Sequence, residues 1–470
     1  MPTVEKTNGT NNRYCEDWLP VKNITNGMIQ LENGYFVCGI KVEPKNIFIL
    51  DEGARNNVIV QLRNFYNTID FEFWMIIADR PVDINLYLAQ LQVLYNKTTN
   101  NITRKLIMQD INKANAFMGA EYNVVDTEYF FLFKEKRMDL IQKKLRTLMS
   151  GLANCGLNSI QVSNSDLRMV LDNFLNGGTQ TNFGDVLMLN IKSELAPKGM
   201  KFDVTDFMIS GKYCTIFTVV SFPKYIAPGY LSDLSNIAGV KVVAKHIPLE
   251  FSTMQKMINK EIADLKVRYQ SEKDQTMQER IRQDYESLEQ FVQMLAATQS
   301  RVFDFQLHLM VIGDSKEDLE NKKMNVRSFL DAMGMQGIPL MFEQEKVLKS
   351  ILPIFPKQDI EDRIGTPIPS PTIAAMYPFI FDSVKDVGNS TLFGVDYSGG
   401  VVLFNQFLYQ VKKEHNRNNG NMIILGTSGS GKSTAAKLLL RSHIRNGYKV
   451  VAIDPEGELE DMARFLGGDF

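Results

Sequence analysis

The residues best suited to chemistry form one glycine-rich run that extends from Gly426 to Ser433 and fits the pattern G-x-x-x-x-G-K-[ST]. Glycines let backbone N–H groups crowd around phosphate oxygens, because no Cβ stands in the way. The helix expected from Ser433 to about Asn446 would point its positive end at the same anion. We therefore predict a phosphate-binding loop (P-loop, or Walker A motif).

Two side chains at the end of the run would meet the rest of a bound nucleotide. Lys432 would place a positive charge beside the β- and γ-phosphates, and the Ser433 hydroxyl would contact Mg²⁺. ATP and Mg²⁺ are therefore the expected ligands, with Ser433 as the one metal contact. The expected nucleotide contacts are Gly426, Thr427, Ser428, Gly429, Ser430, Gly431, Lys432, Ser433 and Thr434.

Three carboxylates follow the loop at a spacing that allows two interpretations. Glu456 or Glu458 could approach the γ-phosphate and orient or deprotonate the attacking water, which makes them candidate catalytic residues. Alternatively, Asp454 and Glu456 cap a turn, and Glu458 begins the next helix, where a negative charge is favourable. Both interpretations remain open from the sequence.

The elements that must position these groups are a strand at 421–425, the helix, and a second strand at 449–453. A Walker B strand, an apolar run ending in Asp, should follow in the same domain. After Thr434 only 470 − 434 = 36 residues remain in the sequence. We therefore expect a C-terminally truncated P-loop domain that binds ATP, and we expect this chain itself to be inactive in hydrolysis, whereas a longer parent would be an ATPase.

The residues before the loop alternate between strand-like and helix-like patterns, which predict, among others, a helix at 52–68 and strands at 201–209 and 302–312. The expected fold class is α/β and α+β multidomain, with mixed N-terminal modules followed by the start of a RecA-like P-loop domain. The expected domains are an N-terminal α/β module at 1–180, a second α+β module at 181–350, a proline-rich connector and β-hairpin at 351–415, and the truncated P-loop NTPase domain at 416–470.

A charged segment at 251–300 has apolar residues at alternating steps of four and three, which predicts a helical hairpin inside the second module. The hairpin could cover its own domain, or it could be an arm that docks a partner.

Composition excludes several classes of protein. With 44% hydrophobic and 23% charged residues, the chain is globular rather than disordered or fibrous. A formal net charge of −2 does not support strong direct binding of nucleic acid. The longest apolar runs fall short of the roughly 20 residues that a membrane-spanning helix needs, so any membrane association is expected to come through partners.

Three segments carry a specific resemblance. They resemble the conjugation ATPases of type IV secretion systems, the VirB-type and TraC-type family in the HerA–FtsK group. The segments are Tyr448 to Glu458, Asp17 to Ile24 with Asn26 to Ile29, and Ala374 to Phe379 with Leu392 to Asp396. The resemblance extends over the whole chain, and its most specific parts are the P-loop and the Asp-Pro-Glu-Gly-Glu segment.

The resemblance implies a motor subunit that energises conjugal transfer through a secretion channel. It implies self-association into an oligomer, contact with membrane channel components, and a cytoplasmic location at the inner face of the cell membrane. Two alternatives remain: a HerA/FtsK-like DNA translocase, and a non-hydrolysing docking fragment of the secretion ATPase.

Overall fold

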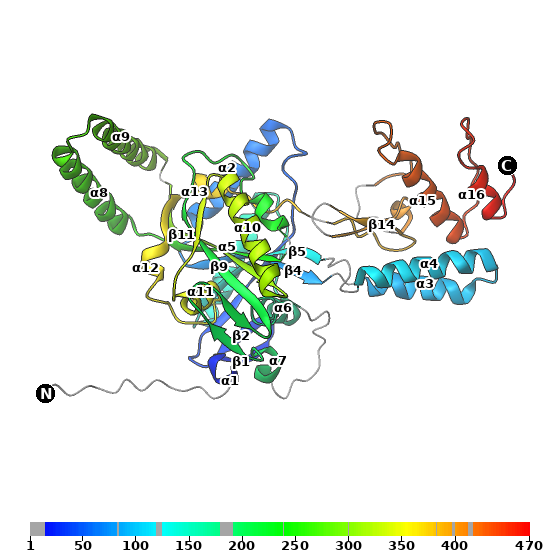
Figure 1. Cartoon of the computed structure of the whole chain (residues 1–470), viewed down its shortest axis with the longest axis horizontal. Helices are drawn as coiled ribbons and strands as arrows, with labels where there is room; N and C mark the ends of the chain where they lie inside the picture. Colours follow the sequence, from blue (N-terminus) through cyan, green and yellow to red (C-terminus); the bar gives the residue numbers. More distant parts are fainter. Residues whose placement is uncertain are drawn as a thin grey trace. The chain divides into compact units, whose positions relative to one another are not determined.

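The chain divides into two compact units in a computed structural model (Figure 1). The structure describes residues 15–81, 84–118, 125–178, 191–237, 239–298, 300–381, 383–396, 400–411 and 417–470. Unit 1 comprises 1–79 and 128–381, and unit 2 comprises 80–127 and 382–470. Each unit is therefore built from two separate stretches of sequence.

Unit 1 is organised around one large sheet. Its described strands pair in the order β1-β2-β3-β5-β4-β10-β11-β9-β8-β7, while β6 pairs with β3, β12 with β9 and β13 with β11. The strands are β1 Val21–Thr25, β2 Met28–Leu31, β3 Phe36–Val42, β4 Phe73–Pro81, β5 Val125–Glu135, β6 Ser159–Gln161, β7 Met200–Phe202, β8 Phe207–Ile209, β9 Lys212–Ser221, β10 Val240–Pro248, β11 Val302–Gly313, β12 Gln336–Pro339 and β13 Thr366–Pro369.

Helices cover both faces of this sheet. The side chains of α2, α5, α10 and α13 share one apolar core with the sheet, and those of α6, α7 and α11 share the other. The helices of unit 1 are α1 Cys15–Trp18, α2 Glu52–Thr68, α5 Met138–Asn154, α6 Asn164–Leu175, α7 Ile191–Leu195, the 3-10 helix η1 Ser232–Asn236, α8 Phe251–Ser271, α9 Gln275–Thr298, α10 Lys316–Ala332, α11 Gln344–Ile351, α12 Glu361–Ile364 and α13 Ser370–Ala375.

The expected fold class is confirmed, since the chain is a multidomain α+β protein with a large antiparallel sheet. Strands from the two expected N-terminal modules nevertheless share that sheet. β10 pairs with β4 on one side, where Val242 faces Ile77, and with β11 on the other. A strand that is covered on both faces is apolar along most of its length, and β10 and β11 have this composition because each contributes side chains to both cores.

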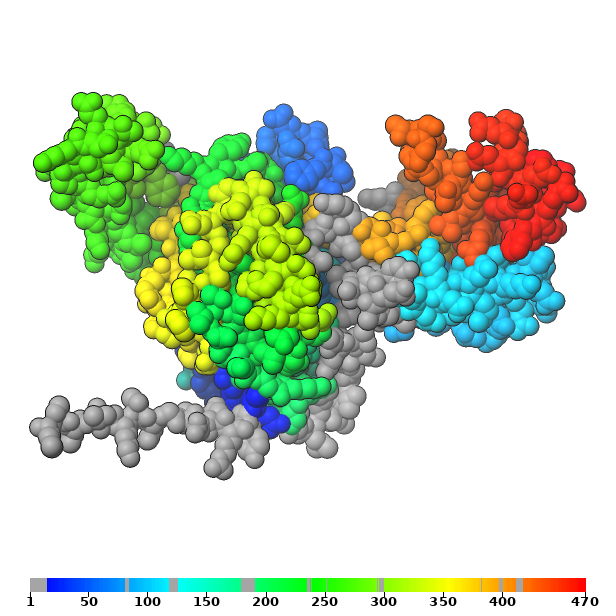
Figure 2. All heavy atoms as spheres, in the orientation of Figure 1, coloured from blue at the N-terminus to red at the C-terminus, as the bar shows by residue number. Residues whose placement is uncertain are grey.

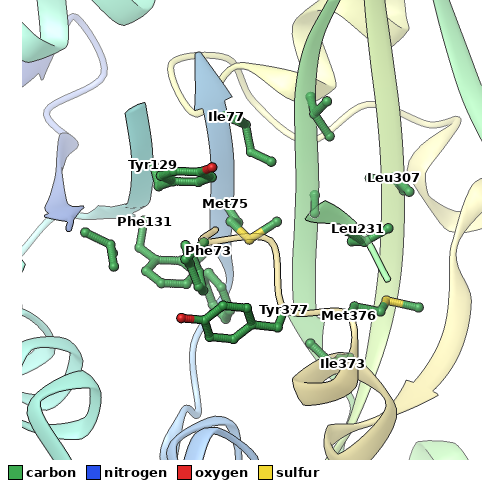
Figure 3. Close-up of a cluster of buried hydrophobic side chains, with 14 of the residues drawn as sticks. Phe73, Met75, Ile77, Tyr129, Phe131, Leu231, Leu307, Ile373, Met376 and Tyr377 are labelled. Atoms are coloured by element: carbon green, nitrogen blue, oxygen red, sulfur yellow. The ribbon is translucent and has the colours of Figure 1, made fainter. Parts of the chain in front are cut away.

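The proline-rich segment, expected to be an extended connector from residue 351, is instead folded into unit 1. β13 pairs with β11, which places Ile368 opposite Phe303. Pro367 and Pro369 are tolerated there because β13 is an edge strand, where a missing N–H leaves no ladder bond unmade. Figure 3 shows Tyr377 in the same buried cluster as Phe73. Residues 351–381 therefore belong to unit 1, and the boundary between the units follows Phe381.

The helical hairpin predicted at 251–300 is formed by α8 and α9, which lie side by side (Figure 1). Leu265 and Ile281 are buried between the two helices, and Met254 and Leu295 form a small core with Val302 at the start of β11. The predicted apolar seam is therefore the surface that joins the two helices.

Unit 2 combines a helical hairpin from the first half of the sequence with the C-terminal segment, and Figure 2 shows them in contact, in cyan and in orange to red. Its small core joins α3 and α4 to a two-stranded sheet. The elements of unit 2 are α3 Asn85–Lys97, α4 Asn101–Met118, β14 Thr391–Val395, β15 Val401–Phe404, α14 Leu408–Val411, α15 Lys432–Arg445 and α16 Glu460–Phe465.

β14 and β15 form the β-hairpin expected in this region. Two residues of its expected turn, Ser398 and Gly399, lie outside the described residues. No helix in the described part of the chain is both long enough and apolar enough to cross a bilayer.

Two buried histidines make the stability of unit 1 depend on pH. His246 and His308 are fully buried, and burial lowers the pKa of each to about 3. An unfolded chain has histidine pKa values of about 6.5, so between these values the unfolded state binds more protons. The free energy of unfolding should therefore fall as the pH drops from about 6.5 towards 3, by about 1.4 kcal/mol per pH unit for each histidine.

Urea unfolding of unit 1 across this pH range tests the expectation. His308→Gln, which can keep a bond to the Thr218 hydroxyl, should show a shallower loss of stability than the wild type. Equal slopes for the two proteins would contradict the role of His308.

Candidate nucleotide-binding site

The glycine-rich run folds as a tight loop that leads directly into α15. Gly429 and Gly431 have φ angles of 78° and 87°, in the left-handed region that disfavours residues with a Cβ. An N–H···O bond of 3.3 Å from Ser430 to the Thr427 carbonyl oxygen closes the turn. The pattern therefore has glycine at the two loop positions where the backbone conformation requires it.

At Gly426 the lack of a side chain matters for a different reason, because side chains of the same loop approach it closely. A Cβ built at this position would lie 2.4 Å from the Ser430 Oγ and 3.3 Å from the Lys432 Cγ. At Gly429 and Gly431, by contrast, an added Cβ would meet no atom within 4 Å. The loop thus turns back closely on its own first residue, while its later glycines face open space.

The N-terminus of α15 is open to an anion. Gly431 is the N-cap and has no side chain that could bond the first backbone N–H groups of the helix. The first of these groups to bond within the helix is the N–H of Ala435, which donates to the Gly431 carbonyl oxygen at 2.9 Å. Residues 426–431 are all exposed. A helix start with unpaired N–H groups and a positive dipole end fits a phosphate group.

Lys432 and Ser433 fit the roles expected for a nucleotide with its metal. The Lys432 ammonium donates one hydrogen bond, of 2.8 Å, to the Thr427 carbonyl oxygen within the same loop. An ammonium has three donors, so it can bond phosphate oxygens while keeping that contact. Ser433 and Thr434 are exposed at the start of the helix. The Ser433 hydroxyl is the group that would contact Mg²⁺.

A glutamine that the sequence did not single out connects the segment before the P-loop to the last turn of α15. Gln406 donates to the Gly420 carbonyl oxygen at 2.6 Å, and its Oε1 lies 2.8 Å from the His443 Nε2. Beside it, the Phe407 ring lies 5.2 Å from the rings of both His443 and Tyr448. The segment before the P-loop is thereby connected to the last turn of α15.

The strands expected at 421–425 and 449–453 are not formed, although the structure describes both segments. A strand needs a neighbour for its backbone groups, and the sheet described in unit 2 contains β14 and β15 alone. Apolar side chains from these segments are consequently exposed, among them Leu425 at 87% and Val451 at 96%.

The carboxylates after the second segment occupy different settings. Asp454 accepts a 2.6 Å bond from the Leu459 N–H just before α16, so it caps a turn. Glu458 lies 3.8 Å from the Lys437 ammonium, in an exposed pair. Glu456 is exposed. Within residues 417–470, neither glutamate bonds to the loop, and their proposed part in hydrolysis remains a prediction.

Replacing these glutamates by glutamine tests that prediction. Glu456→Gln and Glu458→Gln should leave the affinity for Mg–ATP within about twofold, because an exposed side chain without a bond to the loop contributes little. In the longer parent protein that is expected to hydrolyse ATP, at least one of the two variants should turn over ATP more slowly. Wild-type rates in both would assign the segment a structural role, and a tenfold loss of affinity would contradict the described geometry.

Comparison with known families adds two matches. Residues 22–177 match the model of the archaeal TraC-like domain, and residues 420–469 match that of the central domain of the helicase HerA. The first range includes α3 and α4, and the second includes the loop and α15. No curated protein matches the chain.

Proposed function

We propose that this chain binds Mg–ATP through residues 426–434. The two family matches support a P-loop ATPase of the TraC/HerA type. One observation carries the proposal: a glycine loop with two left-handed residues opens an exposed helix N-terminus that begins with Lys432 and Ser433. Positioned N–H groups, one lysine and one hydroxyl are the groups that a P-loop presents to the phosphates and metal of a nucleotide.

The process that ATP would drive is a further step of the proposal. The TraC-like match at 22–177, together with the HerA match, supports a motor subunit of a conjugative type IV secretion system. Such a subunit would assemble with copies of itself and with membrane channel components, at the cytoplasmic face of the membrane.

A HerA/FtsK-like DNA translocase is the second candidate, and the match to the HerA central domain favours it. A translocase must hold DNA, and phosphate contacts from Lys and Arg dominate such binding. The net charge of −2 gives little support to a strong DNA contact by this chain alone. A docking subunit that binds ATP without hydrolysing it is the third candidate.

Transfer of DNA between cells tests the secretion proposal. Lys432→Ala, introduced into the gene in its host, should abolish transfer from donor cells while donor growth stays normal. Lys449→Ala is the matched control, because it removes an exposed lysine of the same unit that lies outside the loop. Normal transfer by the Lys432→Ala donor would overturn the proposal. DNA-stimulated ATP turnover with normal transfer would favour the translocase.

A further inference from the structure

A single carboxylate on α4 holds the helix that follows the P-loop. The two oxygens of Asp110 accept from two arginines of α15: Oδ1 lies 2.9 Å from the Arg441 guanidinium, and Oδ2 accepts from Arg445. Arg441 reaches the same helix twice more, at the Leu106 carbonyl oxygen and the Gln109 side chain. These residues all belong to unit 2.

Arg445 is the buried member of this cluster. Its side chain is 2% exposed and that of Asp110 is 9% exposed. Besides Asp110, Arg445 donates to the Tyr87 hydroxyl at 3.1 Å, the Ser390 carbonyl oxygen at 2.8 Å and the Ser442 Oγ at 3.0 Å. The guanidinium therefore joins α3, α4, the segment before β14 and α15 at one point.

This polar cluster is a large part of what fixes α15 in the unit. The buried residues of the helix are Leu439, Ser442 and Arg445, and two of these three belong to the cluster. A second cation of α4 contributes nearby, where the Lys113 ammonium donates to the carbonyl oxygens of Leu392 and Phe393 in β14. The orientation of α15 thus depends on α4.

The opposite end of α15 is the candidate phosphate site. The helix has 14 residues, a length of about 20 Å at 1.5 Å per residue, and it begins at Lys432. A helix of this length moves as one body, so a change of tilt at Arg445 displaces the N–H groups at the loop. Placing such groups with ångström accuracy is what a preorganised anion site requires.

We propose that Asp110 is a positioning residue for the nucleotide site, which it serves by fixing the orientation of α15 through Arg441 and Arg445. The inference rests on the proposed function, because it concerns the affinity of the same loop for Mg–ATP. By linkage, bound nucleotide stabilises the packing of α4 on α15 to the same extent. The segment that matches the TraC-like domain and the segment that matches HerA are thereby coupled through one ion-pair cluster.

The test is the affinity of the full chain for Mg–ATP in the variant Asp110→Asn. The amide oxygen can still accept from one arginine, but the amide nitrogen is a donor that faces the donors of the other. Affinity should fall about tenfold, a typical coupling between linked sites. Asp110→Glu keeps both acceptor oxygens and should restore part of the loss. Asp461→Asn, an exposed carboxylate-to-amide change in the same unit, should bind as the wild type does.

Binding is measured under conditions in which circular dichroism shows each variant to be folded. If Asp110 had a purely structural role, its replacement would lower the stability of the fold and leave the dissociation constant for Mg–ATP unchanged. Arg441→Gln provides a milder second variant, because it removes the ion pair of the 24% exposed Arg441 with Asp110 and keeps the buried pair of Arg445 with Asp110. This variant should weaken Mg–ATP binding about threefold. Wild-type affinity in Asp110→Asn, or in Arg441→Gln if the former does not fold, would overturn the inference. Absence of Mg–ATP binding by the wild type would overturn the proposed function and the inference together.

Discussion

Replacing Lys432 by alanine is expected to raise the dissociation constant for Mg–ATP about a hundredfold. The ammonium would bond the β- and γ-phosphates, and a hydrogen bond to a charged group contributes about 1.5–3 kcal/mol. Loss of two such bonds at the lower end of this range, about 3 kcal/mol, corresponds to roughly two factors of ten in affinity. Isothermal titration of the full chain with Mg–ATP measures the change.

The variant should keep its fold, because Lys432 makes its one described hydrogen bond within the exposed loop. Lys449→Ala is the matched control and should bind as the wild type does, since Lys449 is exposed and lies outside the loop. An unchanged dissociation constant for Lys432→Ala would mean that nucleotide, if bound, lies elsewhere.

Replacing Glu361 by alanine should destabilise unit 1 by about 3 kcal/mol, the lower end of the range for stranding a buried charge. The Lys245 ammonium lies 2.6 Å from Glu361, and the two side chains are 2% and 1% exposed. Glu72, at 2.7 Å from Lys245 and 36% exposed, would compensate part of the lost charge. The Trp74 ring lies 4.7 Å from the same ammonium.

Urea unfolding followed by tryptophan fluorescence measures this effect in unit 1, because the two tryptophans of the chain, Trp18 and Trp74, both belong to that unit. Asp359→Ala is the control, since it removes a carboxylate from an exposed ion pair with Lys346 and should leave the midpoint near that of the wild type. A Glu361→Ala midpoint equal to that of the control would contradict a stabilising role for the buried pair of Lys245 with Glu361.

Individual elements were predictable where one periodicity extends over a long segment. The helix expected at 52–68 is α2, and its start is fixed by Asp51, whose side chain accepts from the Ala54 N–H at 2.9 Å. The strand expected at 302–312 is β11. The single strand expected at 201–209 is instead the pair β7 and β8, because a turn at Asp203 to Asp206 interrupts the ladder.

The assembly of elements was not predictable in the same way. Periodicity does not show that β4 and β10 are neighbours, because their pairing joins residues far apart in sequence. Proline content alone favours a connector, yet apolar residues around the prolines, such as Ile368 and Tyr377, are buried in the core. The placement of α3 and α4 with the C-terminal segment has no local signal either.

For the candidate site, the sequence was sufficient for the loop and insufficient for its surroundings. The glycines and Lys432 follow a fixed spacing, and a spacing can be read from a sequence. Gln406 and Asp110 act through partners more than thirty positions away, and a lone glutamine or aspartate carries no pattern. The turn at Asp454 was one of two interpretations, and the hydrogen bond to Leu459 supports it for that residue.

Hydrogen–deuterium exchange of the full chain, measured with and without Mg–ATP, locates the nucleotide on the sequence. Bound phosphates should engage the N–H groups of the loop, so exchange should slow in peptides that cover residues 426–434. All of these residues except the half-buried Lys432 are exposed, and few of their backbone N–H groups have a partner. Peptides from β9 in unit 1 should exchange at the same rate in both conditions. Unchanged exchange at 426–434 under saturating Mg–ATP, or protection confined to unit 1, would contradict a nucleotide site at this loop.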